Sequence, residues 1–101
     1  EGLFFLGYQL HKTGQPESAR AENLYRIISP MLFVQGTRDR TCDLDVLRAT
    51  LGRVGAPITL HVVPEADHRF RAPKRTGRTA EEVYEEVLAT VETWIAKILE
   101  S

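Results

Sequence analysis

The sequence is poor in several features that mark specialised classes of protein. Its 101 residues include one cysteine, Cys42, which cannot form a disulfide within the chain and fits a reducing compartment. Seven glycines and five prolines leave no low-complexity tract or linker. Thirteen basic residues against fourteen acidic ones give a net charge of −1, so no excess positive charge points to nucleic acid or to an anionic membrane.

Long apolar runs are also missing. No run approaches the roughly 18 apolar residues of a membrane-spanning helix. The first ten residues, EGLFFLGYQL, lack the basic flank and the cleavage site of a secretory signal. We therefore expect a cytoplasmic protein without a transmembrane segment. With 43% hydrophobic residues, the chain is expected to form a single module over 1–101 with one modest core.

Three short apolar runs predict buried β-strands. They are LFFLGY at residues 3–8, MLFVQ at residues 31–35 and ITLHVV at residues 58–63. Helical patterns separate the strands and follow the last of them. This alternation predicts an α/β fold with a three-stranded parallel sheet and flanking helices, because parallel neighbours need long crossover connections.

Three segments carry sequence signals for helices. Pro16 predicts the start of a first helix that runs to about Arg26. Asp43 can cap a second helix, and Gly55 is expected to end it in a left-handed conformation. A third helix begins with a capping box made of Thr79 and its partner Glu82. Its expected buried stripe consists of Val83, Val87, Val91, Trp94, Ile95 and Ile98.

Two side chains with complementary chemistry follow neighbouring strands of the predicted sheet. Asp39 comes just after the second strand and His68 just after the third. Strands of a parallel sheet end at one edge, about 4.8 Å apart, so the loops can bring the carboxylate onto a ring nitrogen. Alone, an aspartate after GTR would more simply form a turn. The two together predict an acid–base pair.

The segments that carry these residues resemble a known family. PMLFVQGTRDRTCD and VVPEADHRF resemble the acid and histidine loops of α/β-hydrolases of the dienelactone-hydrolase-like branch. GYQLHKTGQPE is similar to a GYPLHPPGKPE-type segment after the sixth strand of that branch, and PKRTGRTAEEV with the terminal helix fits it too. The resemblance covers nearly the whole chain and implies only the C-terminal portion of the fold. It implies that Asp39 is the catalytic acid and His68 the catalytic base.

One part of the family pattern is missing from these residues. The family's serine lies on a G-x-S-x-G turn, and none of the three serines, Ser18, Ser29 and Ser101, stands in such a context. The resemblance places the serine and the oxyanion-hole amides on segments before residue 1, so the simplest interpretation is a truncated hydrolase. Cys42 is an alternative nucleophile, but its position on the acid's own loop disfavours it.

Other candidate residues have simpler explanations. His61 alternates within a predicted strand and is expected to pack on a face or edge, while His11 is expected to be solvated in a polar turn. The segment 69–78 carries five positive charges that could hold an acidic substrate or a phosphate, but a solvated loop is favoured, neutralised by glutamates of the last helix. These charges are Arg69, Arg71, Lys74, Arg75 and Arg78.

Two functions of different classes follow. The first is the acid- and base-bearing part of a serine hydrolase of esters or related small acyl substrates, inactive as this chain alone. The second is a non-catalytic α/β module derived from a hydrolase that associates with itself or with a partner. In both we expect no cofactor, no metal and no nucleic acid. We also expect a homodimer through residues 3–8, because an apolar edge strand without charge or proline is adhesive, or through the terminal helix.

Overall fold

The computed structural model describes residues 2–100 and confirms the predicted fold class. Three parallel strands form one sheet in the order β1 (Leu3–Leu6), β2 (Met31–Gly36) and β3 (Ile58–Val63). Leu3 lies beside Met31, and Met31 in turn lies beside Ile58, so the strands begin level with one another. Their carboxyl ends therefore share one edge, as predicted.

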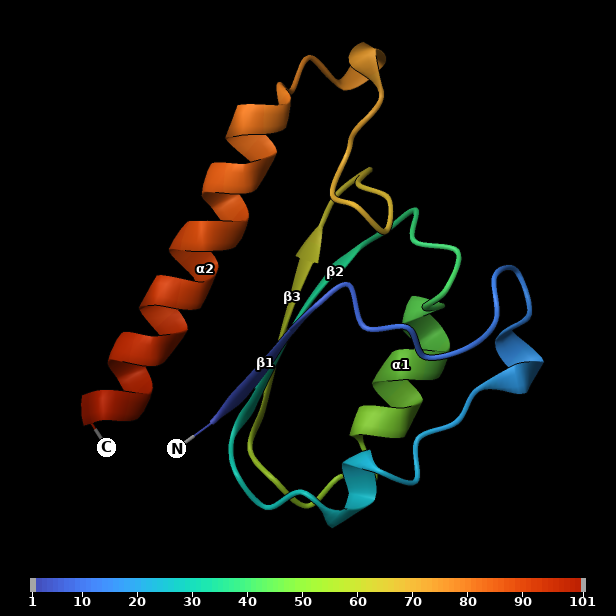
Figure 1. The fold of residues 1–101 in the computed structure, drawn as a ribbon, viewed down its shortest axis with the longest axis vertical. Coiled ribbons are helices and arrows are strands. Elements are labelled where there is room, and N and C mark those ends of the chain that lie inside the picture. The colour runs from blue at the N-terminus through green and yellow to red at the C-terminus, as the bar shows by residue number, and fades with distance from the viewer. Residues whose placement is uncertain (1, 101) are drawn as a thin grey trace.

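The central strand β2 is buried on both faces, and each face of the sheet has its own core. The helix α1 (Leu44–Leu51) and the long β1–β2 connection cover one face, and the helix α2 (Ala80–Glu100) covers the other (Figure 1). Alternation along β2 divides its side chains between the two cores. The α1 side buries Leu10, Leu24, Met31, Phe33, Cys42, Leu47, Leu51 and Ala56, and the α2 side buries Leu32, Val34, Val63, Ala66, Val83, Val87 and Trp94.

Both helix starts confirm the predicted caps. The side chain of Asp43 accepts a hydrogen bond from the backbone N–H of Val46 at 3.0 Å. In α2, the backbone N–H of Thr79 donates to Glu82 Oε1 at 2.8 Å, and that of Glu82 donates to Thr79 Oγ1 at 3.1 Å. The described helices include none long and apolar enough to cross a membrane.

The predicted end of α1 and one residue of the α2 stripe are wrong. The helix ends at Leu51 with Gly52 as its cap, in a right-handed conformation, and Gly55 does not take a positive φ. The chain leaves α1 through a short turn, so no left-handed residue is needed. In α2, Ile95 is 40% exposed because the three-stranded sheet is too narrow to cover that side of the helix.

The predicted helix from Pro16 to Arg26 is also wrong. The segment contains two single 3₁₀ turns, η1 (Pro16–Ser18) and η2 (Leu24–Arg26), joined by irregular chain. Its only fully buried apolar side chain is Leu24, so there is no stripe to hold a helix against the sheet. Ser18 Oγ instead accepts from the Lys12 backbone N–H and donates to the Gln15 carbonyl, which favours a compact loop.

The first strand is shorter than predicted. It ends at Leu6, and Gly7 takes a left-handed φ of 73° that turns the chain away from the sheet edge. Tyr8 follows this turn and packs edge-on against Phe5 and Phe33 in the α1-side core. A further 3₁₀ turn, η3 (Lys74–Thr76), lies in the connection from β3 to α2.

Candidate active site

The loop after β2 holds Asp39 against the loop after β3. The backbone N–H of Thr37 donates to the carbonyl of Val63, and that of Arg38 donates to the carbonyl of Ala66. These bonds continue the pairing of the two strands beyond their ends. Asp39 is therefore positioned by the sheet itself, at its carboxyl edge.

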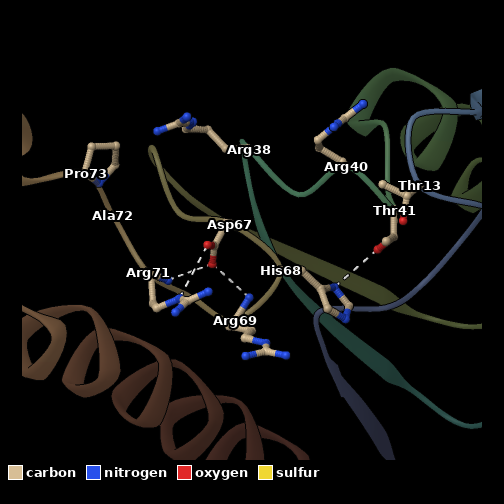
Figure 2. Close-up of a pocket in the computed structure, with 10 residues that line it drawn as sticks. All are labelled: Thr13, Arg38, Arg40, Thr41, Asp67, His68, Arg69, Arg71, Ala72 and Pro73. Atoms are coloured by element: carbon tan, nitrogen blue, oxygen red, sulfur yellow. Dashed lines mark hydrogen bonds and ion pairs between the residues drawn. The ribbon is translucent and has the colours of Figure 1, made fainter.

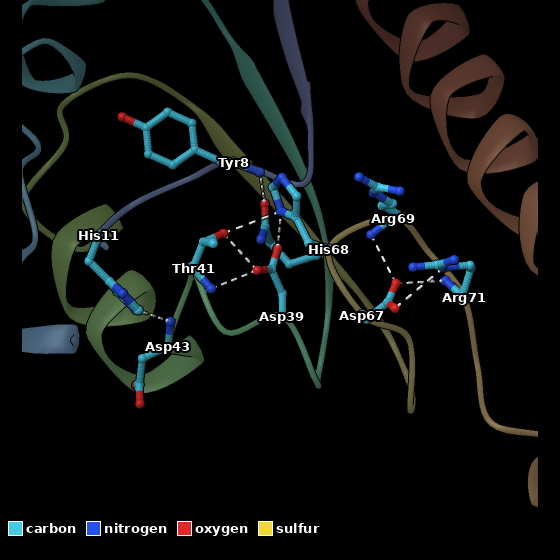
Figure 3. Close-up of polar contacts among 10 residues, drawn as sticks. Tyr8, His11, Asp39, Thr41, Asp43, Asp67, His68, Arg69 and Arg71 are labelled. Atoms are coloured by element: carbon cyan, nitrogen blue, oxygen red, sulfur yellow. Dashed lines mark hydrogen bonds and ion pairs between the residues drawn. The ribbon is translucent and has the colours of Figure 1, made fainter. Parts of the chain in front are cut away.

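The Asp39 carboxylate is fully enclosed and has a donor on each oxygen. Its side chain is 0% exposed. The backbone N–H and the hydroxyl of Thr41 both donate to Oδ1, at 2.8 and 2.6 Å. The second oxygen, Oδ2, lies 2.8 Å from Nδ1 of His68 (Figure 3). Thr41 and His68 together fix the plane of the carboxylate.

His68 occupies the position that the sequence predicted for it relative to Asp39. Its Nδ1 donates to the carboxylate, and the hydroxyl of Thr41 lies 3.2 Å from the same nitrogen. With the proton on Nδ1, the other nitrogen, Nε2, is an acceptor. Within the described residues Nε2 has no hydrogen-bond partner, and the side chain is 45% exposed. This geometry is that of a histidine ready to accept a proton.

A second aspartate shapes the loop that follows His68. Oδ1 of Asp67 accepts the backbone N–H groups of Arg69 and Arg71, at 2.9 and 3.0 Å. Desolvation acts to raise the pKa of Asp67, but these two hydrogen bonds and the two arginine charges outweigh it and lower that pKa. Phe70 is held at a φ of 61°, which is uncommon for an aromatic residue. The loop is thus pinned on the C-terminal side of the base.

His11 supports the acid loop from behind, and the prediction that it is solvated is wrong. The side chain is 5% exposed, its Nδ1 donates to the carbonyl of Lys12 at 2.7 Å, and its Nε2 accepts the backbone N–H of Asp43 at 2.8 Å. Its neutral form satisfies both contacts. No sequence signal marks this role, because the backbone N–H of Asp43 comes beside Nε2 of His11 only when the two loops meet.

The remaining nucleophile candidates lie away from His68 or are unreactive. Ser18 is hydrogen-bonded within the loop around η1. Ser29 precedes β2 and so lies at the amino ends of the strands, opposite to His68. Ser101 lies outside the described residues. Cys42 is buried, and burial, followed by the charges of Asp39 and Asp43, raises the pKa of its thiol to about 12. Such a thiol carries almost no thiolate at neutral pH.

His61 lies where the sequence predicted it, and the basic segment is neutralised only partly as predicted. His61 lies on the edge strand β3, and its Nε2 contacts Glu86 on α2 at 2.6 Å. Glu86 also pairs with Arg78 at 2.7 Å. The other neutralising partners belong to the loop itself, because Arg75 pairs with Glu65 at 3.0 Å and Arg71 with Asp67 at 3.6 Å. Of the six glutamates of the last helix, Glu86 alone forms an ion pair with this segment within residues 2–100.

Across residues 2–100, no group of three or more His, Cys, Asp or Glu side chains is arranged to hold a metal ion. No solved structure matches the chain. The family described as alpha/beta hydrolase domain matches residues 1–96, which include both strand-end loops and most of α2. The chain belongs to the alpha/beta hydrolase domain family.

Proposed function

We propose that this chain carries the catalytic acid and base of a serine hydrolase that cleaves esters or related acyl compounds. The observation that carries the proposal is the 2.8 Å contact between Asp39 Oδ2 and His68 Nδ1, with Nε2 of His68 left as a free acceptor at the carboxyl edge of the sheet. Family membership supports it. The resemblance of both loops to the dienelactone-hydrolase-like branch supports a finer placement in that branch.

The chemistry assigned to each residue follows from this geometry. His68 Nε2 takes the proton of a serine hydroxyl while the serine oxygen bonds to the acyl carbon. The resulting imidazolium is stabilised by the buried Asp39 carboxylate, and it returns the proton to the leaving alcohol as the acyl bond breaks. A water molecule then attacks the acyl-serine by the same proton transfers. We propose that the serine comes from outside residues 1–101, because no described serine lies near His68.

The test begins with the coding DNA on the 5′ side of the Glu1 codon. An in-frame G-x-S-x-G sequence there would allow the joined product to be expressed and labelled with a fluorophosphonate, which traps activated serines. We expect labelling that falls by about three orders of magnitude or more in His68→Gln and Asp39→Asn. The matched control His61→Gln changes a histidine outside the site and should label normally. Labelling that survives loss of His68 would contradict the proposal.

A second candidate function is a non-catalytic module that associates with itself. The observation that favours it is the edge strand β1, whose Leu3, Phe4 and Leu6 side chains are each nearly half exposed. A start codon close to Glu1, together with a stable dimer of the purified chain in sedimentation, would support this candidate over the first. A monomer at tens of micromolar would count against it.

A further inference from the structure

An open cavity of about 610 Å³ lies beside His68 and is lined on two sides by arginines. Arg38 and Arg40 come from the loop after β2, which also carries the acid. Arg69 and Arg71 come from the loop after β3, on either side of Phe70. Figure 2 shows these four side chains around the space that Asp67 and His68 also border.

Most of the positive charge around this cavity is not neutralised by the protein. Arg71 pairs with Asp67, the single acidic residue of the lining. Arg38, Arg40 and Arg69 make no ion pair with any carboxylate in the part of the chain that the structure describes. The Asp39 carboxylate cannot serve them, because it is enclosed behind His68.

The basic residues outside the cavity provide a contrast. Arg75 and Arg78 lie on the same β3–α2 connection and are both paired, with Glu65 and Glu86. The prediction that glutamates of the last helix neutralise the loop therefore holds for Arg78, whereas Arg75 is neutralised by Glu65 of its own loop and the prediction is wrong for Arg69. Unpaired arginines gather where two loops converge on the base, although like charges repel one another there. An anion in the cavity would remove that repulsion.

We propose that this cavity binds an oxyanionic group, a carboxylate or a phosphate ester, carried by the substrate at a distance from the bond to be cleaved. This inference rests on the proposed function and narrows its substrate class to acidic esters. Guanidinium groups suit the role because their planar donors match carboxylate and phosphate oxygens. Neutral, fatty esters would gain nothing from such a lining. Thr13 adds a hydroxyl donor at the same cavity.

The test measures binding by the chain itself and needs no nucleophile. The ¹⁵N-labelled chain is titrated at constant ionic strength with monomethyl succinate, with inorganic phosphate and with the neutral dimethyl succinate. We expect saturable shifts of the Thr41 and Arg69 amides with an anion and none with the neutral diester. Tighter binding of phosphate indicates a phosphate ester, and tighter binding of monomethyl succinate indicates a carboxylate.

Matched variants separate a built site from general charge attraction. Arg40→Gln combined with Arg69→Gln should weaken anion binding about tenfold or more, since a hydrogen bond to a charged group is lost at each position. Arg53→Gln removes the same charge from an exposed position after α1, at the other end of the sheet, and should leave binding unchanged. Amide spectra of each variant show whether it is folded.

Three results would overturn the inference: no saturable shift, equal binding of the neutral diester, or equal weakening by Arg53→Gln. These results are distinct from failure of the proposed function, which shows as fluorophosphonate labelling that does not need His68. An acid–base pair without anion binding would leave the hydrolase proposal standing with an unspecified ester. Anion binding without a competent pair would leave the cavity as a binding site alone.

Discussion

A Cβ atom on Gly36 would lie 2.1 Å from the carbonyl oxygen of Ala66, so the last residue of β2 touches the backbone of the loop that carries His68. Because that neighbour is backbone, it cannot rotate away. Gly36→Ala should force the two loops apart and lower the free energy of unfolding by about 3 kcal/mol. Urea denaturation measures this loss, and the ring signals of His68 report whether its contact with Asp39 survives.

The control for this substitution is Gly55→Ala. No atom lies within 4 Å of a Cβ built on Gly55, and its φ is not in the left-handed region. The variant should be neutral or more stable by about 0.5 kcal/mol, because alanine restricts the unfolded chain. If both substitutions lower the free energy of unfolding by the same amount, the close approach of Gly36 to Ala66 does not determine the loop geometry.

Thr41→Val tests the support of the buried acid. The change keeps the side-chain shape and removes the hydroxyl that donates to Asp39 Oδ1 at 2.6 Å. Since the carboxylate is enclosed, loss of this donor should lower the free energy of unfolding by about 2 kcal/mol. Thr41→Ser keeps the donor and should retain most of the stability. A Val variant as stable as the wild type would show that the hydroxyl contributes nothing to holding the acid.

The sheet and its edge were predictable because their signals are local. Apolar runs of five or six residues predicted all three strands, and the rule that parallel strands end together then placed Asp39 and His68 close to one another. The capping residues Asp43 and Thr79 were equally local, since each acts on residues a few positions ahead. The helix predicted for residues 16–26 was wrong because Pro16 indicates only where a helix can start, and no apolar stripe follows it to hold a helix against the sheet.

Other parts of the candidate site depend on contacts between distant segments. His11 and Asp43 are 32 positions apart, and nothing in the turn around His11 distinguishes a buried imidazole from a solvated one. The pairing of Arg75 and Arg78, against the unpaired Arg69, likewise depends on where Glu65 and Glu86 lie after folding. The sequence alone showed a run of positive charges and did not indicate which of them would be paired and which would not.

The raised pKa of the Cys42 thiol predicts that the free energy of unfolding decreases at alkaline pH. Burial raises this pKa from its ordinary value of 9.0 to about 12, so the folded chain keeps the thiol proton more tightly than the unfolded chain. The contribution is fully present below pH 9 and is lost as the pH rises toward 12, by up to about 1.4 kcal/mol per pH unit. Denaturation curves at several pH values measure it.

Cys42→Ala is the control for that pH dependence. It should remove most of the decline with pH. The part due to Tyr8 should remain, because burial raises the pKa of Tyr8, as does the charge of Cys42 to a lesser extent. Native chain should also resist iodoacetamide at pH 8, where the thiol is protonated and enclosed. Rapid, stoichiometric alkylation of the folded chain would contradict the buried position of Cys42.

The purified chain should not form an acyl intermediate. With an activated ester such as p-nitrophenyl acetate, we expect no burst, because an acid–base pair without a serine and oxyanion donors has no group to acylate. His68→Ala should leave the slow background rate unchanged. Stopped-flow absorbance and intact mass measure both. A stoichiometric adduct that disappears in His68→Ala would reveal a nucleophile within these residues.

The last prediction concerns self-association through β1, which remains a proposal. The backbone N–H groups of Leu3 and Gly7 donate to Pro30 and Val34 on the β2 side. Alternation along a strand then directs the N–H groups of Phe4 and Leu6 toward the open edge. The strand LFFL has neither charge nor proline to protect that edge. Antiparallel pairing of two copies would satisfy these groups and give a continuous six-stranded sheet with twofold symmetry.

Substitutions on opposite faces of the strand distinguish this dimer from one built on α2. Phe4 lines a hollow with Ile95 and Leu99 of the helix, so Phe4→Lys should dissociate either dimer. Leu3 points to the α1 side, so Leu3→Lys should dissociate only the strand-edge dimer. Leu99 has a side chain that is 80% exposed, and Leu99→Lys should dissociate only the helix dimer. Light scattering at tens of micromolar measures each mass. A dimer that resists Leu3→Lys and yields to Leu99→Lys would refute pairing through β1, and a monomeric wild type would refute both.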